Sequence, residues 1–180
     1  VESEPLGTGG AVAHAVPMLT GTGPVIILNG DLISSVDVRS LLSHHQKTEA
    51  SATLSLWEVE DPSRFGVCDL DDSGMIRRFQ EKPERGMEFS NLINAGCSIV
   101  ERSILNSLPT GKFSMEREVF PNIAQSGSMA GLVFEGYFVD AGTPSSFIQA
   151  ATVCILNSRF STGRREGNNW FGEGSVSKGV

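Results

Sequence analysis

Two aspartates are the residues best placed to do chemistry. Asp31 ends the apolar run PVIILNGD, and Asp140 ends GLVFEGYFVD. Ligands bind outside the carboxyl ends of the strands in an open α/β sheet, so both carboxylates would face one crevice. Mg²⁺ takes few protein ligands and keeps room for phosphate oxygens. The pair predicts a magnesium and phosphate site, whereas either aspartate alone is equally consistent with a turn or a helix cap.

Another candidate site is Glu81-Lys82-Pro83. Proline disfavours helix in the residue before it, so we expect Lys82 to be extended, with the Glu81 and Lys82 side chains on opposite faces of the chain. The carboxylate could accept hydrogen bonds from sugar hydroxyls, and the ammonium could pair with a phosphate. A solvated turn is the alternative for so short a motif.

Familiar catalytic and cofactor motifs are missing. The dinucleotide pattern GxGxxG needs a glycine where Val12 stands, and the P-loop needs one where Asn106 stands. The sequence has no CxxC, HExxH or GxSxG motif. His14, His44 and His45 fall on expected helices without a companion at metal-ligand spacing, so we expect them in surface or packing roles.

Composition narrows the class of partner. Lysine and arginine total 14 against 21 acidic residues, and the resulting net charge of −7 disfavours nucleic acid and anionic membranes. The apolar runs are too short to span a bilayer, and no basic segment precedes a hydrophobic one at the start, so we expect a soluble, cytoplasmic protein. We expect Cys68, Cys97 and Cys154 to be reduced core residues.

Helical and strand patterns alternate along the chain, which predicts an α/β class with a Rossmann-like, mostly parallel sheet flanked by helices. The run at 24–31 is typical of a strand buried on both faces of a parallel sheet. Further strands are expected at 51–59, 65–71, 75–83, 92–101 and 131–142, and helices at 9–16, 37–48, 102–108 and 115–127.

Local signals mark several boundaries. Asp37 and Thr143 are in position to cap helices, and Pro144 follows the second cap. The turn at 71–74 predicts a hairpin. The last helix carries one apolar stripe, made of Phe147, Ala150, Ala151, Cys154 and Ile155. From Ser158 onward the chain is polar and rich in Gly and Asn, as in a linker, a tail or the first turn of a separate element.

Seven motifs, taken in order, resemble the sugar-nucleotidyltransferase family and within it the mannose-1-phosphate guanylyltransferase branch. They are EPLGTGGA, NGD, FGV, FxEKP, NAG, SxExxxFP and VDAGTP, over residues 2 to about 157. The resemblance implies that a sugar 1-phosphate attacks the α-phosphate of a nucleoside triphosphate, giving a nucleotide sugar and pyrophosphate, with Mg²⁺ as cofactor. Positioning and charge neutralisation carry such a reaction.

The resemblance also implies roles for individual residues. Asp31 and Asp140 match the magnesium aspartates, and Lys82 matches the lysine that contacts the sugar 1-phosphate. Sugar-contacting positions match Gly66, Glu81, Asn94 and, less closely, Glu116. The segment lining the nucleotide base matches Glu4, Pro5, Gly7, Thr8 and Gly9. A carboxylate such as Glu4 can accept hydrogen bonds from both the N1–H and the 2-amino group of guanine, so GTP is the expected nucleotide, unless Glu4 only caps a turn.

One family feature is not found in these 180 residues. The family's G-G-x-G-T-R-L loop, which cradles the triphosphate, would precede EPLGTGG. We therefore expect a chain truncated at its N-terminus that lacks the first strands, turns over little alone, and has an apolar sheet edge that favours association. We expect residues 1–157 to be the C-terminal two-thirds of the catalytic domain, and 158–180 to be a linker and the start of a left-handed β-helix.

Two other function classes were weighed. A non-catalytic regulatory or sugar-nucleotide-binding subunit would have less need of Asp31, Asp140 and Lys82 together. A metal-dependent glycosyltransferase is disfavoured on the expectation that the DxD triplet which such an enzyme needs does not occur in this chain. The identity of the sugar and the oligomeric state stay open, because hydroxyl placement alone separates mannose, glucose and heptose phosphates.

Overall fold

The computed structural model describes residues 4–159 and 162–175. The chain divides into two compact units, and each is described by itself. Unit 1 comprises Val1–Asn29 and Val36–Glu135, and unit 2 comprises Gly30–Ser35 and Gly136–Val180. The alternation of strands and helices confirms the α/β class predicted from the sequence.

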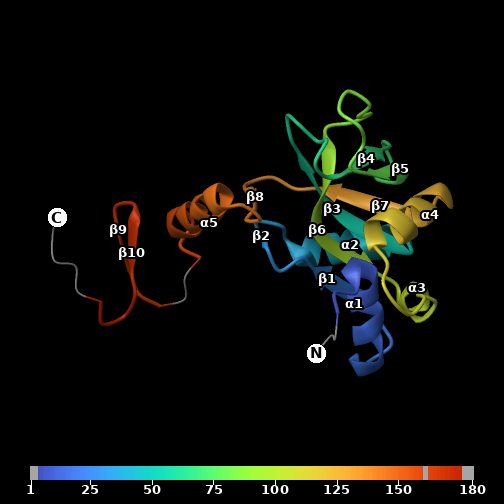
Figure 1. The fold of residues 1–180 in the computed structure, drawn as a ribbon, viewed down its shortest axis with the longest axis horizontal. Helices are drawn as coiled ribbons and strands as arrows, with labels where there is room; N and C mark the ends of the chain where they lie inside the picture. The colour runs from blue at the N-terminus through green and yellow to red at the C-terminus, as the bar shows by residue number, and fades with distance from the viewer. Residues whose placement is uncertain (1–3, 160–161, 176–180) are drawn as a thin grey trace. The chain divides into compact units, whose positions relative to one another are not determined.

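A six-stranded sheet forms the centre of unit 1 (Figure 1). Its order is β5-β4-β6-β3-β7, and β1 also pairs with β6. The strands are β1 (Val25–Leu28), β3 (Ala52–Glu58), β4 (Gly66–Leu70), β5 (Ile76–Glu81), β6 (Leu92–Val100) and β7 (Met129–Val133). The sheet is mixed rather than mostly parallel, because within the described residues β3 and β7 are its parallel pair and the other ladders are antiparallel.

Four helices and two short turns complete unit 1. They are α1 (Gly7–Ala15), η1 (Val16–Met18), α2 (Val38–Thr48), α3 (Arg102–Asn106), the π-helical turn η2 (Met115–Val119) and α4 (Phe120–Gln125). The predicted cap of α2 is confirmed, since the Asp37 carboxylate accepts a hydrogen bond from the Arg39 N–H at 3.0 Å. Pro17 falls in η1, just after α1 ends, as expected for a residue that cannot continue a helix.

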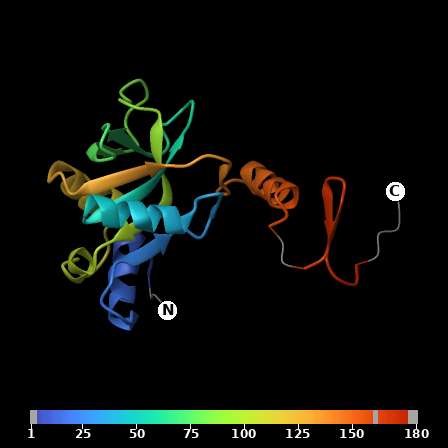
Figure 2. The same ribbon diagram turned by 180° about the vertical axis from the view of Figure 1, so that it is seen from behind.

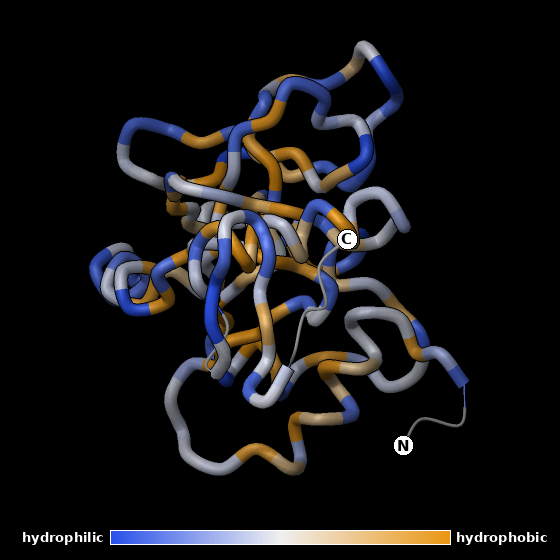
Figure 3. Tube along the Cα trace, turned by 90° about the vertical axis from the view of Figure 1, so that its left-hand side faces the viewer, coloured by the Kyte–Doolittle hydropathy of each residue, from blue (hydrophilic) through white to orange (hydrophobic). Residues whose placement is uncertain are grey.

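The sheet buries side chains on both faces. On one face Leu54 and Leu56 of β3 pack in a cluster with Leu105 of α3 and Phe120 of α4. On the other face Leu41 of α2 packs against alternate residues of β6. Figure 2 shows α2 covering the face opposite to that of α1, α3 and α4. In Figure 3 the hydrophobic segments of the tube gather centrally, while many of the outer loops are hydrophilic.

The prediction for residues 24–31 was wrong in two respects. β1 runs antiparallel to β6, and its burial alternates, with Ile26 42% and Leu28 61% exposed. Within the described residues β1 pairs on one side, with β6. A run of Val, Ile and Leu has the same pattern whether one or both faces are covered, so the sequence could not settle this.

The single strand expected at 131–142 is two strands. β7 ends at Val133, and β8 (Phe138–Asp140) belongs to unit 2. Gly136, between them, has φ +115°, a backbone conformation that an L side chain rarely adopts. The alternating pattern on either side of this glycine hid the break.

Unit 2 contains β2 (Leu32–Ser34) paired with β8, helix α5 (Pro144–Leu156), and the hairpin of β9 (Arg164–Glu166) with β10 (Asn169–Phe171). The Thr143 cap is confirmed as a capping box, since its hydroxyl accepts from the Ser146 N–H. The α5 stripe is buried at Ala150, but Phe147 is 67% exposed. Residues 162–175 form an antiparallel hairpin where a β-helix turn was expected, and residues 176–180 of that turn lie outside the described residues.

No helix in the described ranges, 4–159 and 162–175, is long and apolar enough to cross a membrane.

Candidate active site

The glycines at the start of α1 allow a close approach to residues 111–113. The Gly9 and Gly10 N–H groups donate to the Phe113 carbonyl at 3.0 and 3.4 Å, and the Phe113 N–H donates to the Leu6 carbonyl at 3.1 Å. A Cβ atom on Gly9 would collide with the Phe113 ring, and one on Gly10 would collide with the Gly111 carbonyl. These glycines therefore dock α1 onto the segment that leads into η2.

Thr8 and Glu116 meet at this junction. The Thr8 hydroxyl donates to Glu116 Oε2 at 2.6 Å, and the Ser114 hydroxyl donates to the same oxygen at 2.8 Å. The Met115 N–H donates to the Thr8 hydroxyl at 3.0 Å. Two residues from distant motifs, EPLGTGGA and SxExxxFP, are thus joined directly.

A cavity of about 200 Å³ lies beside this junction, within unit 1. It brings together three predicted residues, namely Thr8, Asn94 and Glu116, and Asn29 of the NGD motif also lines it. The Asn94 side-chain oxygen accepts from the Gly96 N–H at 3.1 Å, which holds that amide in place. The cavity has a polar set of carboxylate, amide and hydroxyl groups on an otherwise largely apolar lining.

Gly66, Glu81 and Lys82 form a second group in unit 1. Gly66 pairs with Glu81 in the β4–β5 ladder, and a Cβ atom on Gly66 would lie 3.1 Å from Glu81 Oε2. The Lys82 N–H donates to the Phe65 carbonyl at 2.9 Å, which continues the pairing of the two strands beyond Gly66 and Glu81. The FGV and FxEKP motifs are therefore strand neighbours.

The expected backbone of Lys82 was wrong. Its φ is +46°, so it is left-handed rather than extended, although Pro83 follows it. The two side chains do not separate, since Lys82 Nζ lies 3.5 Å from Glu81 Oε1. Left-handed backbone at a non-glycine residue costs about 1 kcal/mol or more and often marks a functional position.

Glu81 is the predicted carboxylate with a shifted pKa. Burial raises the pKa of Glu81, the Lys82 ammonium lowers it, and the negative charge of Glu116 raises it further. The interaction with Glu116 means that the Glu81–Lys82 pair and the cavity carboxylate belong to one electrostatic neighbourhood. A carboxylate whose pKa is raised by burial and by a neighbouring like charge is a candidate functional residue.

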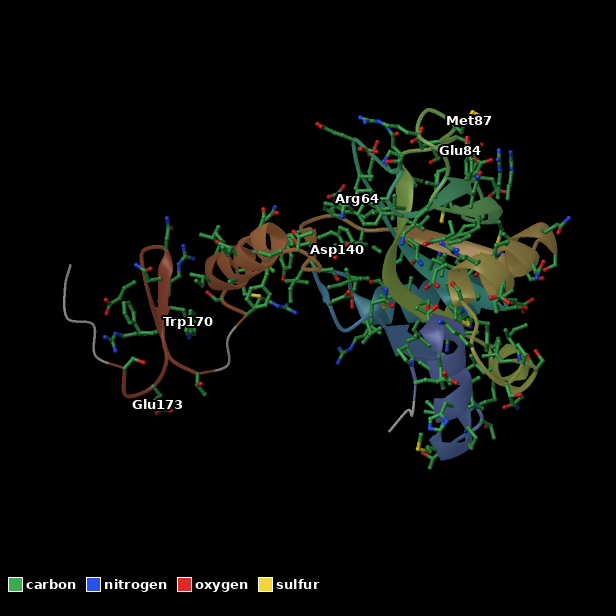
Figure 4. The ribbon with its side chains drawn as sticks, viewed as in Figure 1. Arg64, Glu84, Met87, Asp140, Trp170 and Glu173 are labelled. Carbon is green, nitrogen blue, oxygen red and sulfur yellow. The ribbon has the colours of Figure 1, made fainter. Side chains whose placement is uncertain are left out.

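Asp31 and Asp140 are neighbours in unit 2. Asp140 pairs with Leu32 in the β2–β8 ladder, and the Ala141 N–H donates to the Asp31 carbonyl at 2.9 Å. Figure 4 labels Asp140 on β8. One of its carboxylate oxygens, Oδ1, accepts from the Gly142 N–H at 2.9 Å. Asp31 lies in the turn that precedes β2. The direction of its side chain is therefore not determined by the alternation of side chains along a strand.

This donor set fits Mg²⁺ better than a closed metal site. The described residues contain no group of three or more His, Cys, Asp or Glu side chains able to hold a metal. Two carboxylates at the ends of paired strands suit an ion that is held by one or two protein ligands and otherwise by water and phosphate.

Two expectations concern residues away from these groups. Glu4 and Pro5 are exposed at the start of the described chain. The argument against a glycosyltransferase was wrong, because Asp69-Leu70-Asp71 is a DxD triplet. Asp71, however, accepts hydrogen bonds from Ser73 and Met75 within the β4–β5 turn, a structural role.

A packing role is confirmed for His45. Its ring is buried between Thr53 Oγ1 at 2.8 Å and Glu101 Oε1 at 3.1 Å. Sequence reasoning did not single out Ser114, although it is the first residue of SxExxxFP.

Residues 1–155 match the family model described as "Nucleotidyl transferase". The chain belongs to the nucleotidyl transferase family. It is 37% identical over 153 residues to mannose-1-phosphate guanylyltransferase of Mycobacterium tuberculosis, covering 83% of this chain and 42% of that protein. It is 37% identical over 160 residues to mannose-1-phosphate guanylyltransferase catalytic subunit beta of Danio rerio, covering 88% and 44%. The chain thus spans less than half the length of these curated relatives.

Two solved structures share the fold of this chain. HddC from Yersinia pseudotuberculosis, complexed with GMP-PN, is 30% identical with a TM-score of 0.67, covering 83% of this chain and 63% of that one. A Bacillus anthracis structure assigned as a glucose-1-phosphate thymidylyltransferase, in complex with sucrose, has a TM-score of 0.75 over 91% of this chain and 66% of that one. At 22% identity, the second likeness supports the fold alone.

Proposed function

We propose that this chain serves the transfer of a nucleotidyl group from a nucleoside triphosphate to a sugar 1-phosphate, with GTP and mannose 1-phosphate as the substrates. The observation that carries the proposal is the meeting of Thr8, Asn94 and Glu116 on one cavity, with Glu81 in electrostatic contact with Glu116. The names of the relatives, mannose-1-phosphate guanylyltransferases, support the choice of substrates.

The cavity residues suit the recognition of a sugar. Carboxylate and amide oxygens of Glu116, Glu81 and Asn94 accept hydrogen bonds from hydroxyl groups, and a site built from such acceptors discriminates strongly against an analogue that lacks the hydroxyl. Lys82 carries the neighbouring positive charge, and its side chain is 57% exposed, so it is free to meet a phosphate that arrives from solvent.

The aspartates of unit 2 have a separate task in the proposal. Asp31 and Asp140 would hold Mg²⁺, which when bound neutralises charge on phosphate oxygens. The Gly142 N–H hydrogen bond keeps the Asp140 carboxylate oriented. The alternative, a non-catalytic sugar-nucleotide-binding subunit, would have less need of these two carboxylates.

Titration calorimetry of the whole chain tests the proposal. In the presence of Mg²⁺ we expect mannose 1-phosphate to bind, and Lys82→Ala to weaken that binding about tenfold, as for the loss of one charged hydrogen bond. Arg85→Ala is the matched control, a cation three residues further on in an exposed loop. Binding that is insensitive to Lys82 would contradict the proposed role.

Nucleotide choice has its own experiment. We expect GTP to bind more tightly than UTP or ATP, and Glu4→Gln to weaken GTP binding while leaving ATP binding unchanged, because only guanine offers the paired donors. Glu84→Gln, in an exposed loop, is the control. Equal or tighter binding of UTP or ATP would overturn the GTP assignment. The affinity for GDP-mannose is a further measurement. If it is the same with and without Mg²⁺, and the same for the double variant Asp31→Asn, Asp140→Asn, the non-catalytic subunit is favoured.

A further inference from the structure

We propose that Thr8 and Ser114 are positioning residues that aim the Glu116 carboxylate at one hydroxyl group of the sugar. The inference rests on the proposed function and adds a part that neither the motifs nor the relatives assign. Its basis is the direction of each hydrogen bond around Glu116, which the neighbouring backbone groups determine.

The hydroxyl groups of Thr8 and Ser114 both donate their hydrogens to Glu116. Thr8 Oγ1 accepts the Met115 N–H at 3.0 Å, and Ser114 Oγ accepts the Arg117 N–H at 3.3 Å. A backbone N–H only donates, and each hydroxyl has a single hydrogen. Both hydrogens therefore point at Glu116 Oε2, at 2.6 and 2.8 Å.

Glu116 is left with one engaged oxygen and one available oxygen. Oε2 receives both hydroxyl donors, while Oε1 accepts no hydrogen bond from the residues that the structure describes. The side chain is half-buried and lines the cavity with Asn94. Two charge-assisted bonds on Oε2 fix the rotamer, so Oε1 needs no reordering when a hydroxyl group arrives.

The support behind this carboxylate is itself fixed. Ser114 begins the π-helical turn η2, and its N–H donates to Glu118 Oε1 at 3.1 Å. The Phe113 carbonyl accepts from both Gly9 and Gly10 of α1. A π-helical turn is frequent at functional sites. The orientation of Glu116 therefore depends on the first turn of α1, in the segment expected to line the nucleotide base.

A purely structural role for Thr8 is the competing explanation. A hydroxyl that only docks α1 onto η2 would, when removed, lower stability and weaken all ligands alike. If Thr8 positions Glu116, its removal should instead change one ratio. This is the affinity for a sugar phosphate divided by the affinity for the analogue that lacks the hydroxyl contacted by Glu116.

The test measures this ratio by calorimetry with mannose 1-phosphate and its 2-deoxy and 3-deoxy counterparts. For the wild-type chain we expect about a tenfold loss with one of the two analogues. Thr8→Val and Ser114→Ala should each reduce that ratio to about threefold, Glu116→Ala should abolish it because it removes the acceptor, and Thr8→Ser should keep the wild-type value. Thr48→Val is the matched control, because its hydroxyl bonds to the α2 backbone and does not line the cavity.

Each outcome decides one of the two proposals. If Glu116→Ala abolishes the ratio while Thr8→Val and Ser114→Ala keep the wild-type value, Glu116 is a ligand residue and the positioning role is overturned. If the wild-type chain binds no sugar phosphate, the proposed function fails first. Should Thr8→Val not fold, as judged by its melting curve, Ser114→Ala alone decides, because it leaves the contact of α1 with Met115 in place.

Discussion

Unit 1 and unit 2 bury very different amounts of apolar surface. Among the described residues, nearly all of the fully buried hydrophobic side chains belong to unit 1, with Leu54 at 0% exposure. Unit 2 contributes Val139 and Ala150, and its helix α5 exposes 67% of Phe147 and 69% of Ile148. Since hydrophobic stabilisation grows with the apolar area removed from water, unit 1 carries most of the stability.

The comparison also separates two groups of candidate residues, one in each unit. The cavity with Thr8, Asn94 and Glu116 is built on the well-packed unit, where supporting hydrogen bonds are fixed by tertiary contacts. The aspartates lie on the β2–β8 pair of the sparsely packed unit, where each strand has three residues. Sugar recognition is therefore expected to survive changes in unit 2 better than metal binding survives them.

The largest expected effect comes from comparing one leucine in each unit, buried in unit 1 and exposed in unit 2. Leu54→Ala should lower the free energy of unfolding of unit 1 by about 3 kcal/mol, whereas Leu156→Ala, at a residue 47% exposed on α5, should cost less than about 1 kcal/mol. Urea unfolding followed by fluorescence measures both, with Trp57 reporting on unit 1 and Trp170 on unit 2 in single-tryptophan variants. Equal losses would contradict the difference in packing.

The next effect concerns the close approach of α1 to Phe113. Gly9→Ala should destabilise unit 1 by about 1–3 kcal/mol, since the new methyl group collides with the Phe113 ring. Gly172→Ala in unit 2 is the control, because its methyl group would meet nothing nearer than Ser175 Oγ at 3.5 Å. Combined with Phe113→Leu, the cost of Gly9→Ala should shrink, and additive costs would show that the ring is not the obstacle.

Local signals explain how much of the fold the sequence predicted. The caps at Asp37 and Thr143 and the turn at 71–74 depend on residues within a few positions of each other, and the structure contains all three. The direction of β1 depends on its pairing with β6, about seventy residues away, and Lys82 lies where β5 ends, in a cross-strand hydrogen bond with Phe65. Such nonlocal pairings leave no trace in a pattern of hydrophobic residues.

The candidate site divides in the same way. Ordered motifs singled out Thr8, Asn94 and Glu116, which the structure brings to one cavity. The role of Ser114 was not predictable from the sequence. Its hydroxyl and that of Thr8, 106 residues earlier in the chain, donate to the same oxygen, Glu116 Oε2. Contacts of this kind require the docking of α1, which no single motif encodes.

A smaller effect concerns the pH dependence of stability, which should differ between the hairpins of the two units. The pKa of Asp71 is lowered to about 2, chiefly by the Ser73 hydroxyl and then by the Met75 N–H. Its folded pKa lies below the unfolded value of about 4, so its contribution to stability is complete above about pH 4 and is lost as pH falls through 2. The difference in unfolding free energy between wild type and Asp71→Asn should therefore shrink between pH 5 and pH 2.

The β9–β10 hairpin supplies the control for that titration. Its Arg164–Glu166 pair, at 2.7 Å, has both side chains more than half exposed. Exposed pairs contribute about 0–1 kcal/mol and are screened by salt, so Glu166→Gln should change stability little and Asp71→Asn more. A larger effect at Glu166 would mean that the hairpin of unit 2 is held more firmly than its burial indicates.

The last prediction concerns the reactivity of the cysteines in the two units and involves no change in stability. All three thiols are free, with Cys68 and Cys97 buried in unit 1 and Cys154 half-buried on α5. Burial raises the pKa of Cys68 strongly and that of Cys97 to about 11, so at pH 8 only about one thousandth of Cys97 is thiolate. In the native chain a disulfide reagent should label Cys154 first. Labelling in urea should reach all three, and fast labelling of Cys97 without urea would show that β6 opens readily in the native state.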